Sequence, residues 1–353
     1  MLVLCTNLYI FAHKATLMKE TLSTISKRTG VSISTISRIL SGKAEKYRIS
    51  SSTVSLIKAE AKRCGYQPLH VEKNLRSGRI KTIGLLVPSL RNPFFAEIAS
   101  IVISEAGKKN YTTIVLDTME DVNVLKKEIS TLVDKKVDGI IVVPCGEDST
   151  LLEQVNRNIF PVVLVDRYYE NCDLCFMTTN NFQGGINAVN HLLLHGHKKI
   201  ACIQGVPESM PNIERVSGYK KAMTEAGYND YIVVTGNEFT IRNGYLSTKL
   251  LLRDKDQFSA IFALSNTIML GALKAVREAG LRVPEDISII SFDDYYYLDF
   301  MEPPITRICQ PTDEMCNMAV RVLFEKIEKK RDGITQIRFS PTLKEGKSVY
   351  YLK

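Results

Sequence analysis

Residues 22–42 read LSTISKRTGVSISTISRILSG, and this stretch predicts two short helices joined by a tight turn. Ile25 lies on the inner face of the first expected helix, and Gly30 is a turn residue that tolerates positive φ. Ser32 is placed to cap the second helix. The second helix carries apolar residues at the i, i+3, i+4 spacing of a buried face, namely Ile36, Ile39 and Leu40.

The other positions of the second helix face outward, near its N-terminal end. In a helix-turn-helix, this end of the recognition helix meets base edges in the major groove of DNA. The side chains predicted to contact DNA are Ser32, Ile33, Ser34, Thr35, Ser37 and Arg38. A short helix pair of this kind is also typical of ordinary packing, so the interpretation depends on the segments that come next in the chain.

A third amphipathic helix comes after the pair, and residues 48–53 (RISSST) supply its cap. Next come CGYQP at 64–68, NLRSG at 74–78 and the apolar strand TIGLLVP at 82–88. In this order the motifs resemble the LacI/GalR family of bacterial transcription regulators, and the resemblance runs from about Met18 almost to the C-terminus.

From Thr82 onward, apolar strand-like runs alternate with helical stretches, which predicts βαβ units and parallel sheets. The resemblance implies an α/β fold class: an N-terminal helix-turn-helix DNA-binding head and a periplasmic-binding-protein-like body of two Rossmann-like lobes. The chain would cross between lobes near 166–180, near 293–310 and near Phe339. The expected domains are an extension (1–17), the head (18–68), a hinge or linker (69–80) and an effector-binding and dimerisation body (81–353), with lobe 1 at about 81–165 and 310–338 and lobe 2 at about 180–309 and 339–353.

Residues 1–17 are apolar but lack the charged start and small-residue cleavage site of a signal peptide. Met18 stands where the family's head begins, so we expect translation to start there; the alternative is a disordered extension. No apolar run approaches the roughly 20 residues of a membrane span. The eight cysteines are scattered, and the single CxxC at 172–175 indicates free thiols rather than a metal or redox site.

Charge is segregated along the chain, whose formal net charge is +8. Residues 18–82 contain 14 Lys or Arg and 4 Asp or Glu, whereas residues 83–353 are slightly acidic. A basic head on an acidic body indicates that only the head meets a polyanion such as DNA.

Polar side chains at the ends of the expected body strands are the candidates for binding an effector. A carboxylate and a guanidinium that face one crevice can hydrogen-bond vicinal hydroxyls, and aromatic rings can contact a sugar or base. The candidates are Phe94, Phe95, Asp166, Arg215, Phe239, Asn266 and Asp293. The resemblance places four of them, Arg215, Phe239, Asn266 and Asp293, in the family's effector pocket; the alternative is that they cap helices or pair at the surface. Thr267 replaces the family's usual Asp after Asn266, which leaves the effector class open.

Leu75 is the one large apolar residue in the polar stretch 72–78. In the family, a leucine at this place wedges into the DNA minor groove when two hinge segments become helical side by side. The alternative is a linker leucine that packs on the body.

These features predict a cytoplasmic, nucleoid-associated homodimer that binds double-stranded operator DNA and a small-molecule effector, without contact with a membrane. We expect a repressor whose effector is a sugar or sugar acid. The alternatives are a solute-binding protein of the same body fold, or a regulator with a purine-like effector. No cofactor, metal site or enzymatic activity is expected, because the sequence contains no GxSxG or P-loop motif and HLLLHGHKKI at 191–200 reads as a helix end with a Gly stop.

Overall fold

The computed structural model describes residues 21–64, 66, 79–253 and 258–352. They fall into two units, divided between residues 77 and 78. The described residues up to Tyr66 are called the head and those from Arg79 the body. The expected extension at 1–17 and most of the expected linker at 69–80 lie outside the described residues. Within the described ranges, no helix is long and apolar enough to span a bilayer.

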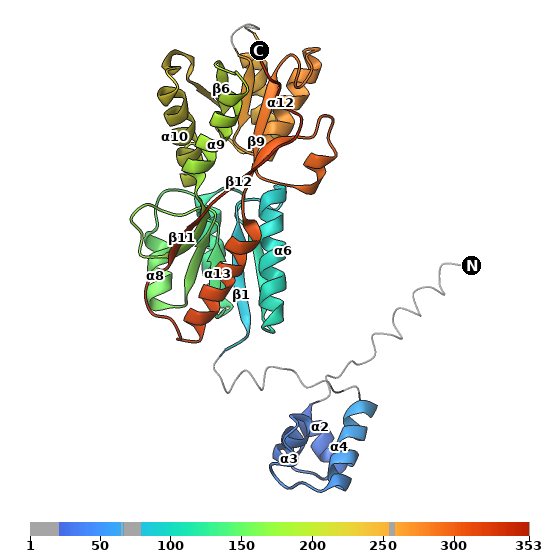
Figure 1. The fold of residues 1–353 in the computed structure, drawn as a ribbon. Coiled ribbons are helices and arrows are strands. Elements are labelled where there is room, and N and C mark those ends of the chain that lie inside the picture. Colours follow the sequence, from blue (N-terminus) through green and yellow to red (C-terminus); the bar gives the residue numbers. More distant parts are fainter. Residues whose placement is uncertain (1–20, 65, 67–78, 254–257, 353) are drawn as a thin grey trace, which may run out of the picture. The chain divides into compact units, whose positions relative to one another are not determined.

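Three helices lie in the described part of the head: α2 (Leu22–Thr29), α3 (Ile33–Leu40) and α4 (Ser51–Arg63) (Figure 1). They surround a small apolar core made of Ile25, Ile36, Ile39, Ile57 and Ala61. The predicted helix-turn-helix is therefore confirmed.

Local signals set the ends of these helices. Gly30 ends α2 with φ at 67°, a conformation that glycine adopts without steric cost. The Ser32 hydroxyl accepts the Thr35 N–H at 3.2 Å and caps α3, as predicted. Ser50 caps α4 in the same way, accepting the Thr53 N–H at 3.3 Å.

The body contains two sheets of six strands each, one per lobe (Figure 1). All pairs of the first sheet are parallel. Its strands, in spatial order, are β11 (Gln336–Phe339), β5 (Cys175–Thr179), β4 (Val162–Val165), β3 (Gly139–Val142), β1 (Thr82–Val87) and β2 (Thr112–Asp117).

Helices cover both faces of this first sheet. One face packs against α6 (Pro93–Lys108) and α13 (Thr312–Ile327), with Leu85 and Val87 in the shared core. The other face, which includes Leu86, packs against α7 (Val122–Asp134) and α8 (Thr150–Asn158). Burial on both faces explains why the central strands β1, β3 and β4 read as continuous apolar runs.

The second sheet repeats this plan, with one antiparallel edge strand. Its strands are β12 (Thr342–Lys344), β10 (Thr306–Cys309), β9 (Ser288–Phe292), β8 (Ala260–Ala263), β6 (Ile200–Ile203) and β7 (Val233–Thr235), of which β12 runs antiparallel to β10. Its helices are α9 (Asn181–Leu194), α10 (Met210–Glu225), α11 (Ile241–Leu251) and α12 (Asn266–Glu278). Two 3-10 turns, Asn229–Tyr231 and Tyr296–Asp299, lie in its connections.

The chain passes between the sheets three times: from β5 into α9, from β10 into α13, and from β11 to β12. The segments expected to be crossings therefore contain strands that were not predicted, namely β5, β10 and, near Phe339, β11. Each is at most five residues long, and each is defined by pairing with strands that lie elsewhere in the chain. Strands β5 and β10 mix polar with apolar residues, as CFMTT and TRIC, whereas recognised strands of similar length, such as β3 (GIIV) and β4 (VVLV), are continuous apolar runs.

Glycines set how closely α11 and α12 approach. A Cβ added to Gly244 of α11 would lie 2.0 Å from the Ile268 carbonyl oxygen, and one added to Gly271 of α12 would lie 2.1 Å from the Ile241 carbonyl oxygen. In both cases the clash is with a backbone carbonyl oxygen, which cannot move away by a change of rotamer as a side chain could.

We expect Gly244→Ala to lower the free energy of unfolding by roughly 1–3 kcal/mol, because the two helices must move apart to admit the methyl group. Urea unfolding followed by circular dichroism measures the change. Gly107→Ala in α6 is the matched control: no atom lies within 4 Å of an added Cβ there, so alanine should leave stability unchanged or raise it by up to about 1 kcal/mol. Equal stability of wild type and Gly244→Ala would contradict the argument.

Candidate functional site

The head carries a surface that fits the predicted contact with DNA. The N-terminal half of α3 exposes Ile33, with 48% of its surface accessible, together with Ser32 and Ser34. Arg38 is exposed one turn further along, while Thr35 and Ser37 are half-buried. Ile33 is not part of the apolar core of the head. Exposed apolar side chains of a recognition helix can contact the methyl group of thymine in the major groove.

Three of the predicted contact residues, Ser32, Ser34 and Thr35, already bond to one another at the helix cap. The Ser32 hydroxyl lies 2.8 Å from the Thr35 hydroxyl and 3.0 Å from that of Ser34. Ile33 and Arg38 have no part in these bonds, so they are the side chains of α3 most available for an outside partner.

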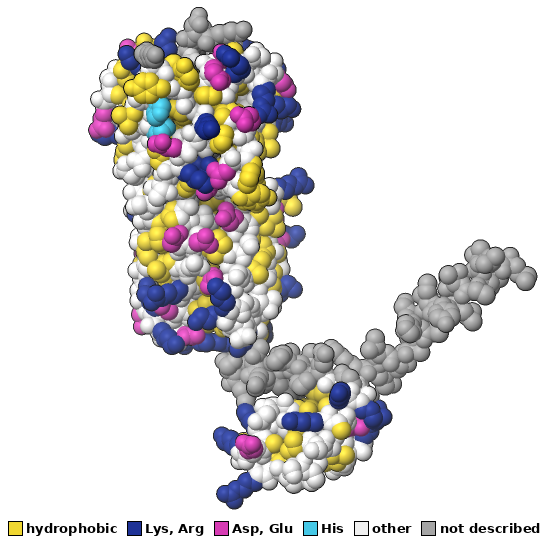
Figure 2. Space-filling view, turned by 45° about the vertical axis from the view of Figure 1, so that its right-hand side comes forward, with side chains coloured by type: hydrophobic (Ala, Val, Ile, Leu, Met, Phe, Trp, Pro, Cys, Tyr) yellow, Lys and Arg dark blue, Asp and Glu magenta, His cyan; other side chains and the backbone are white. Residues whose placement is uncertain are grey.

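The head surface is strongly basic. Residues 21–64 include nine Lys or Arg against two Glu. On the face of the head seen in Figure 2, Lys and Arg side chains are spread over the surface and acidic ones are few. Such a surface attracts the phosphates of DNA whatever the sequence.

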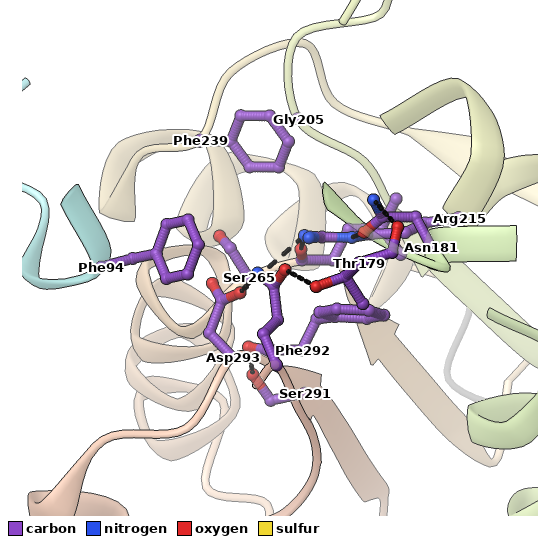
Figure 3. A network of polar contacts seen from close by, with 12 residues as sticks. Phe94, Thr179, Asn181, Gly205, Arg215, Phe239, Ser265, Ser291, Phe292 and Asp293 are labelled. Carbon is purple, nitrogen blue, oxygen red and sulfur yellow. Dashed lines mark hydrogen bonds and ion pairs between the residues drawn. The ribbon is translucent and has the colours of Figure 1, made fainter. Parts of the chain in front are cut away.

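Within the body, the carboxyl ends of the strands of both lobes converge on a small cavity of about 20 Å³. This is room for roughly one water molecule. Six of the seven predicted effector residues line it: Phe94, Phe95, Asp166, Arg215, Phe239 and Asp293. Figure 3 shows the rings of Phe94 and Phe239 beside the charged group formed by Arg215 and Asp293.

Arg215 of α10 is the buried cation of this cavity, with 3% of its surface exposed. Its Nε donates to Asn181 Oδ1 at 2.8 Å, and its Nη1 donates to the Leu264 carbonyl oxygen at 2.7 Å. Its guanidinium carbon lies 3.6 Å from the centroid of the Phe292 ring, and its Nη1 lies 4.0 Å from Asp293 Oδ1. The side chain is therefore fixed from three sides before any ligand arrives.

Two carboxylates face Arg215 from the ends of β4 and β9. Both Asp166 and Asp293 have positive φ, 64° and 76°, a conformation that costs a non-glycine residue about 1–3 kcal/mol and that is common at functional sites. Burial raises the pKa of Asp166 to about 6, although Arg215 and Arg167 oppose the rise. Asp166 Oδ1 has no hydrogen-bond partner among the described residues, which leaves a buried acceptor for a ligand to satisfy.

Asp293 is better satisfied than Asp166. Gln310 Nε2 donates to its Oδ1 at 2.7 Å. Burial raises the pKa of Asp293, while Arg215, the Gln310 side chain and the Asn266 backbone act against the rise.

A second arginine, Arg167, closes the cavity next to Asp166. It donates through both Nη atoms to Glu120, with Nη2 to Oε2 at 3.1 Å. Its guanidinium carbon also lies 5.6 Å from the Phe95 ring centroid and 5.9 Å from that of Phe239. Glu120 therefore balances the charge of Arg167, and the pair borders a neighbouring hollow of about 200 Å³ between the lobes.

The lining of the cavity differs from the predicted set: it omits Asn266 and includes five residues that were not predicted. Asn266, the first residue of α12, is fully buried but does not line the cavity; neither polar atom of its side chain has a partner within the described ranges. The lining residues that were not predicted are Asn92, Arg167, Pro211, Ser265 and Gln310. Asn92 and Ser265 are the N-caps of α6 and α12, a signal that could have identified them, and Pro211 lies in the first turn of α10.

Polar contacts join the two lobes around this cavity. Thr179, at the end of β5, donates to Gln310 Oε1 at 2.6 Å, so that Gln310 links the first lobe to Asp293. At the lobe boundary, the Tyr168 hydroxyl donates to Glu214 of α10 at 2.7 Å and accepts from Arg338 of β11 at 3.1 Å. The Tyr168–Glu214 bond joins lobe 1 to α10 of lobe 2, so relative movement of the lobes would break it, whereas Tyr168 and Arg338 both belong to lobe 1.

Two features named from the sequence lie elsewhere. Leu75 falls outside the described residues. The histidines after residue 190 form the end of α9: Gly196 has φ at 86°, and the His197 ring contacts Ser259 Oγ at 2.9 Å and the Tyr350 carbonyl oxygen at 3.0 Å. The predicted helix end with a Gly stop is confirmed.

Comparison with known proteins places this arrangement in a family. Residues 189–349 match the family model described as a periplasmic binding protein-like domain. The ribose operon repressor of Haemophilus influenzae is 32% identical over 94% of this chain and 99% of its own length. The HTH-type transcriptional repressor PurR of Pasteurella multocida is 33% identical over 93% of this chain and 98% of its own.

Solved structures agree with these relatives. A LacI family transcriptional regulator from Enterococcus faecium, crystallised with bound ribose, is 26% identical and covers 77% of this chain and 100% of its own, with a TM-score of 0.71. The lac repressor dimer bound to operator and the anti-inducer ONPF shares the fold, with a TM-score of 0.82 over 94% of this chain and 99% of its own at 22% identity. With two repressors more than 30% identical over nearly its whole length, the chain belongs to the LacI family of transcriptional regulators.

Proposed function

We propose that this protein is a dimeric transcription repressor that binds operator DNA through α3 and is controlled by a small neutral sugar in the body cavity. The observation that carries the proposal is the cavity itself, where Asp166, Arg215 and Asp293 meet beside Phe94 and Phe239. Carboxylates accept from sugar hydroxyls, the guanidinium donates to them, and the rings cover the apolar face of a sugar.

The charges favour a neutral sugar over a sugar acid or a phosphate. Glu120 balances Arg167, which leaves two buried carboxylates against one buried arginine at the cavity. An anionic ligand would add a third negative charge in a place with little water to screen it. Ribose is a suitable first candidate, because one relative is a ribose operon repressor and one structural neighbour was crystallised with ribose.

The effector would act by shifting a population of lobe arrangements. The cavity of about 20 Å³ cannot admit a sugar until the lobes move apart or rearrange. A ligand that binds one arrangement more tightly biases the equilibrium toward it and, through the linker, changes how two heads are presented to DNA.

On DNA, α3 would lie in the major groove with Ile33, Ser34 and Arg38 on base edges and the basic surface on phosphates. Leu75 of the linker would wedge into the minor groove at the operator centre. The protein would act in the cytoplasm, at the nucleoid, and not as an enzyme. The relatives are repressors over more than nine tenths of the chain, which disfavours a solute-binding protein.

Selection of fragmented genomic DNA by the purified protein, with and without D-ribose, tests the proposal. We expect enrichment of a few fragments that share a near-palindromic site, as two symmetric heads require, and a change in their enrichment when ribose is present. Ribose binding without enrichment of any fragment would favour a solute-binding role. If enrichment changes with a purine base and not with ribose, the effector is a purine and the proposal of a sugar is wrong.

We expect Asp293→Asn to weaken ribose binding at least about tenfold, because it removes a buried charged acceptor next to Arg215. Operator affinity without ribose should stay within about twofold, since DNA contacts lie in the head. Calorimetry and fluorescence anisotropy measure the two affinities. Asp286→Asn is the matched control, because Asp286 is a lobe 2 carboxylate that pairs at the surface with Arg282. A normal ribose response from Asp293→Asn would show that the cavity is not the effector site.

Ribose affinity should also depend on pH through Asp166. Its pKa of about 6 lies above the usual value, so the carboxylate is protonated below pH 6 and ionised above it. An ionised carboxylate is the stronger acceptor, so affinity should rise about tenfold between pH 5 and pH 7.5. Asp166→Asn should bind ribose weakly with no such rise. An unchanged pH profile in Asp166→Asn would assign the titration to another group.

A further inference from the structure

Tyr47 is an exposed aromatic side chain of the head whose position the apolar core does not explain. It lies in the loop between α3 and α4, with 42% of its surface accessible, and it is absent from the cluster of apolar side chains that holds the three helices together. Its ring instead meets Arg38 of α3, whose guanidinium carbon lies 4.2 Å from the ring centroid.

The loop that carries Tyr47 is held in place by its own backbone. The Lys43 N–H donates to the Arg38 carbonyl oxygen at 2.9 Å, and the Tyr47 N–H donates to that of Lys43 at 3.3 Å. On the other side of Tyr47, the Ile49 N–H donates to the Ala44 carbonyl oxygen at 3.0 Å. Ala44 and Ile49 both pack against the head core. These bonds and contacts fix the loop backbone at Tyr47, and this fixes where the Tyr47 ring lies relative to α3.

Arg38 differs from Arg28 and Arg63, two of the other three arginines of the described head, in having no carboxylate partner there. Arg63, on α4, pairs with Glu60 at 2.7 Å, and Arg28 lies 3.7 Å from the same carboxylate. The Arg38 side chain has no ion pair or hydrogen bond to any described residue, and the contact with Tyr47 is the one that holds it. A guanidinium that stacks by its face keeps the N–H groups at its edge free, and these are the groups that pair with guanine O6 and N7.

We propose that Tyr47 is a positioning residue for base recognition: it holds the Arg38 guanidinium so that its N–H edge points outward before DNA arrives. The inference rests on the proposed reading of a base by Arg38. A free arginine side chain samples many rotamers, and the stacked one reaches the groove with most of that freedom already removed.

The test compares Tyr47→Ala with Tyr47→Phe in the full-length protein at one salt concentration. Fluorescence anisotropy gives the affinity for the operator, for an operator changed at the base pair that Arg38→Ala identifies, and for unrelated DNA. Tyr47→Ala should lower discrimination between the first two about two- to fivefold, the range expected for loss of an exposed cation–π contact. Tyr47→Phe keeps the ring and should discriminate as wild type does. Affinity for unrelated DNA should be unchanged in both variants, whereas a misfolded head would weaken it.

A double-mutant cycle separates failure of this inference from failure of the proposed function. In the Arg38→Ala background, Tyr47→Ala should have no further effect on discrimination. If Arg38→Ala itself leaves discrimination intact, base reading by Arg38 is wrong and the proposed contact fails with it. If Arg38→Ala abolishes discrimination while Tyr47→Ala retains it in full, Arg38 reads the base unaided and the positioning role is overturned. Equal losses in Tyr47→Ala and Tyr47→Phe would also overturn it, because the hydroxyl and not the ring would then matter.

Discussion

Both lobes depend on the burial of a parallel sheet on its two faces. In the first lobe α6 and α13 cover one face and α7 and α8 the other, so every residue within β3 and β4 is buried. Neither face of such a sheet is exposed to solvent, so polar side chains are found mainly at the ends of its strands. The crevice at the carboxyl ends is a consequence of that constraint, and it collects Asp166 from one sheet and Asp293 from the other.

The charges gathered there form two separate sets. Arg215 is held by Asn181 and the Leu264 carbonyl oxygen, which leaves it aligned with Asp293 without a close ion pair. Arg167 is neutralised by Glu120. Asp166 Oδ1, which lines the cavity, has no hydrogen-bond partner among the described residues. A ligand with hydroxyl donors could form the hydrogen bond that Asp166 lacks, and this bond would stabilise the ligand-bound arrangement of the lobes. A small polar molecule could in this way shift the equilibrium between lobe arrangements.

In both the body and the head, a neighbouring side chain holds a proposed contact residue in place. In the body, Gln310 connects the strand end at Thr179 to the carboxylate of Asp293. In the head, Tyr47 holds Arg38. Gln310 and Tyr47 need not contact the ligand or the DNA themselves. Each fixes the side chain of a proposed contact residue, Asp293 or Arg38, and such preorganisation lowers the entropy lost on binding.

Short-range signals made much of this protein predictable from its sequence. The caps at Ser32 and Ser50, the turn at Gly30 and the spacing of Ile36 and Ile39 depend on neighbours within a few residues, and the structure has each of them. Strand ends likewise indicated Asp166 and Asp293, and the family resemblance pointed to Arg215 and Phe239 as well. Tertiary structure alone decided the edge strands, which exist only through pairing, and the contacts between distant residues: Arg167 with Glu120, 47 positions away, and Gln310 with Thr179, 131 positions away. No local pattern encodes such pairs, because their distance in the chain carries no information about their distance in space until the sheets have formed.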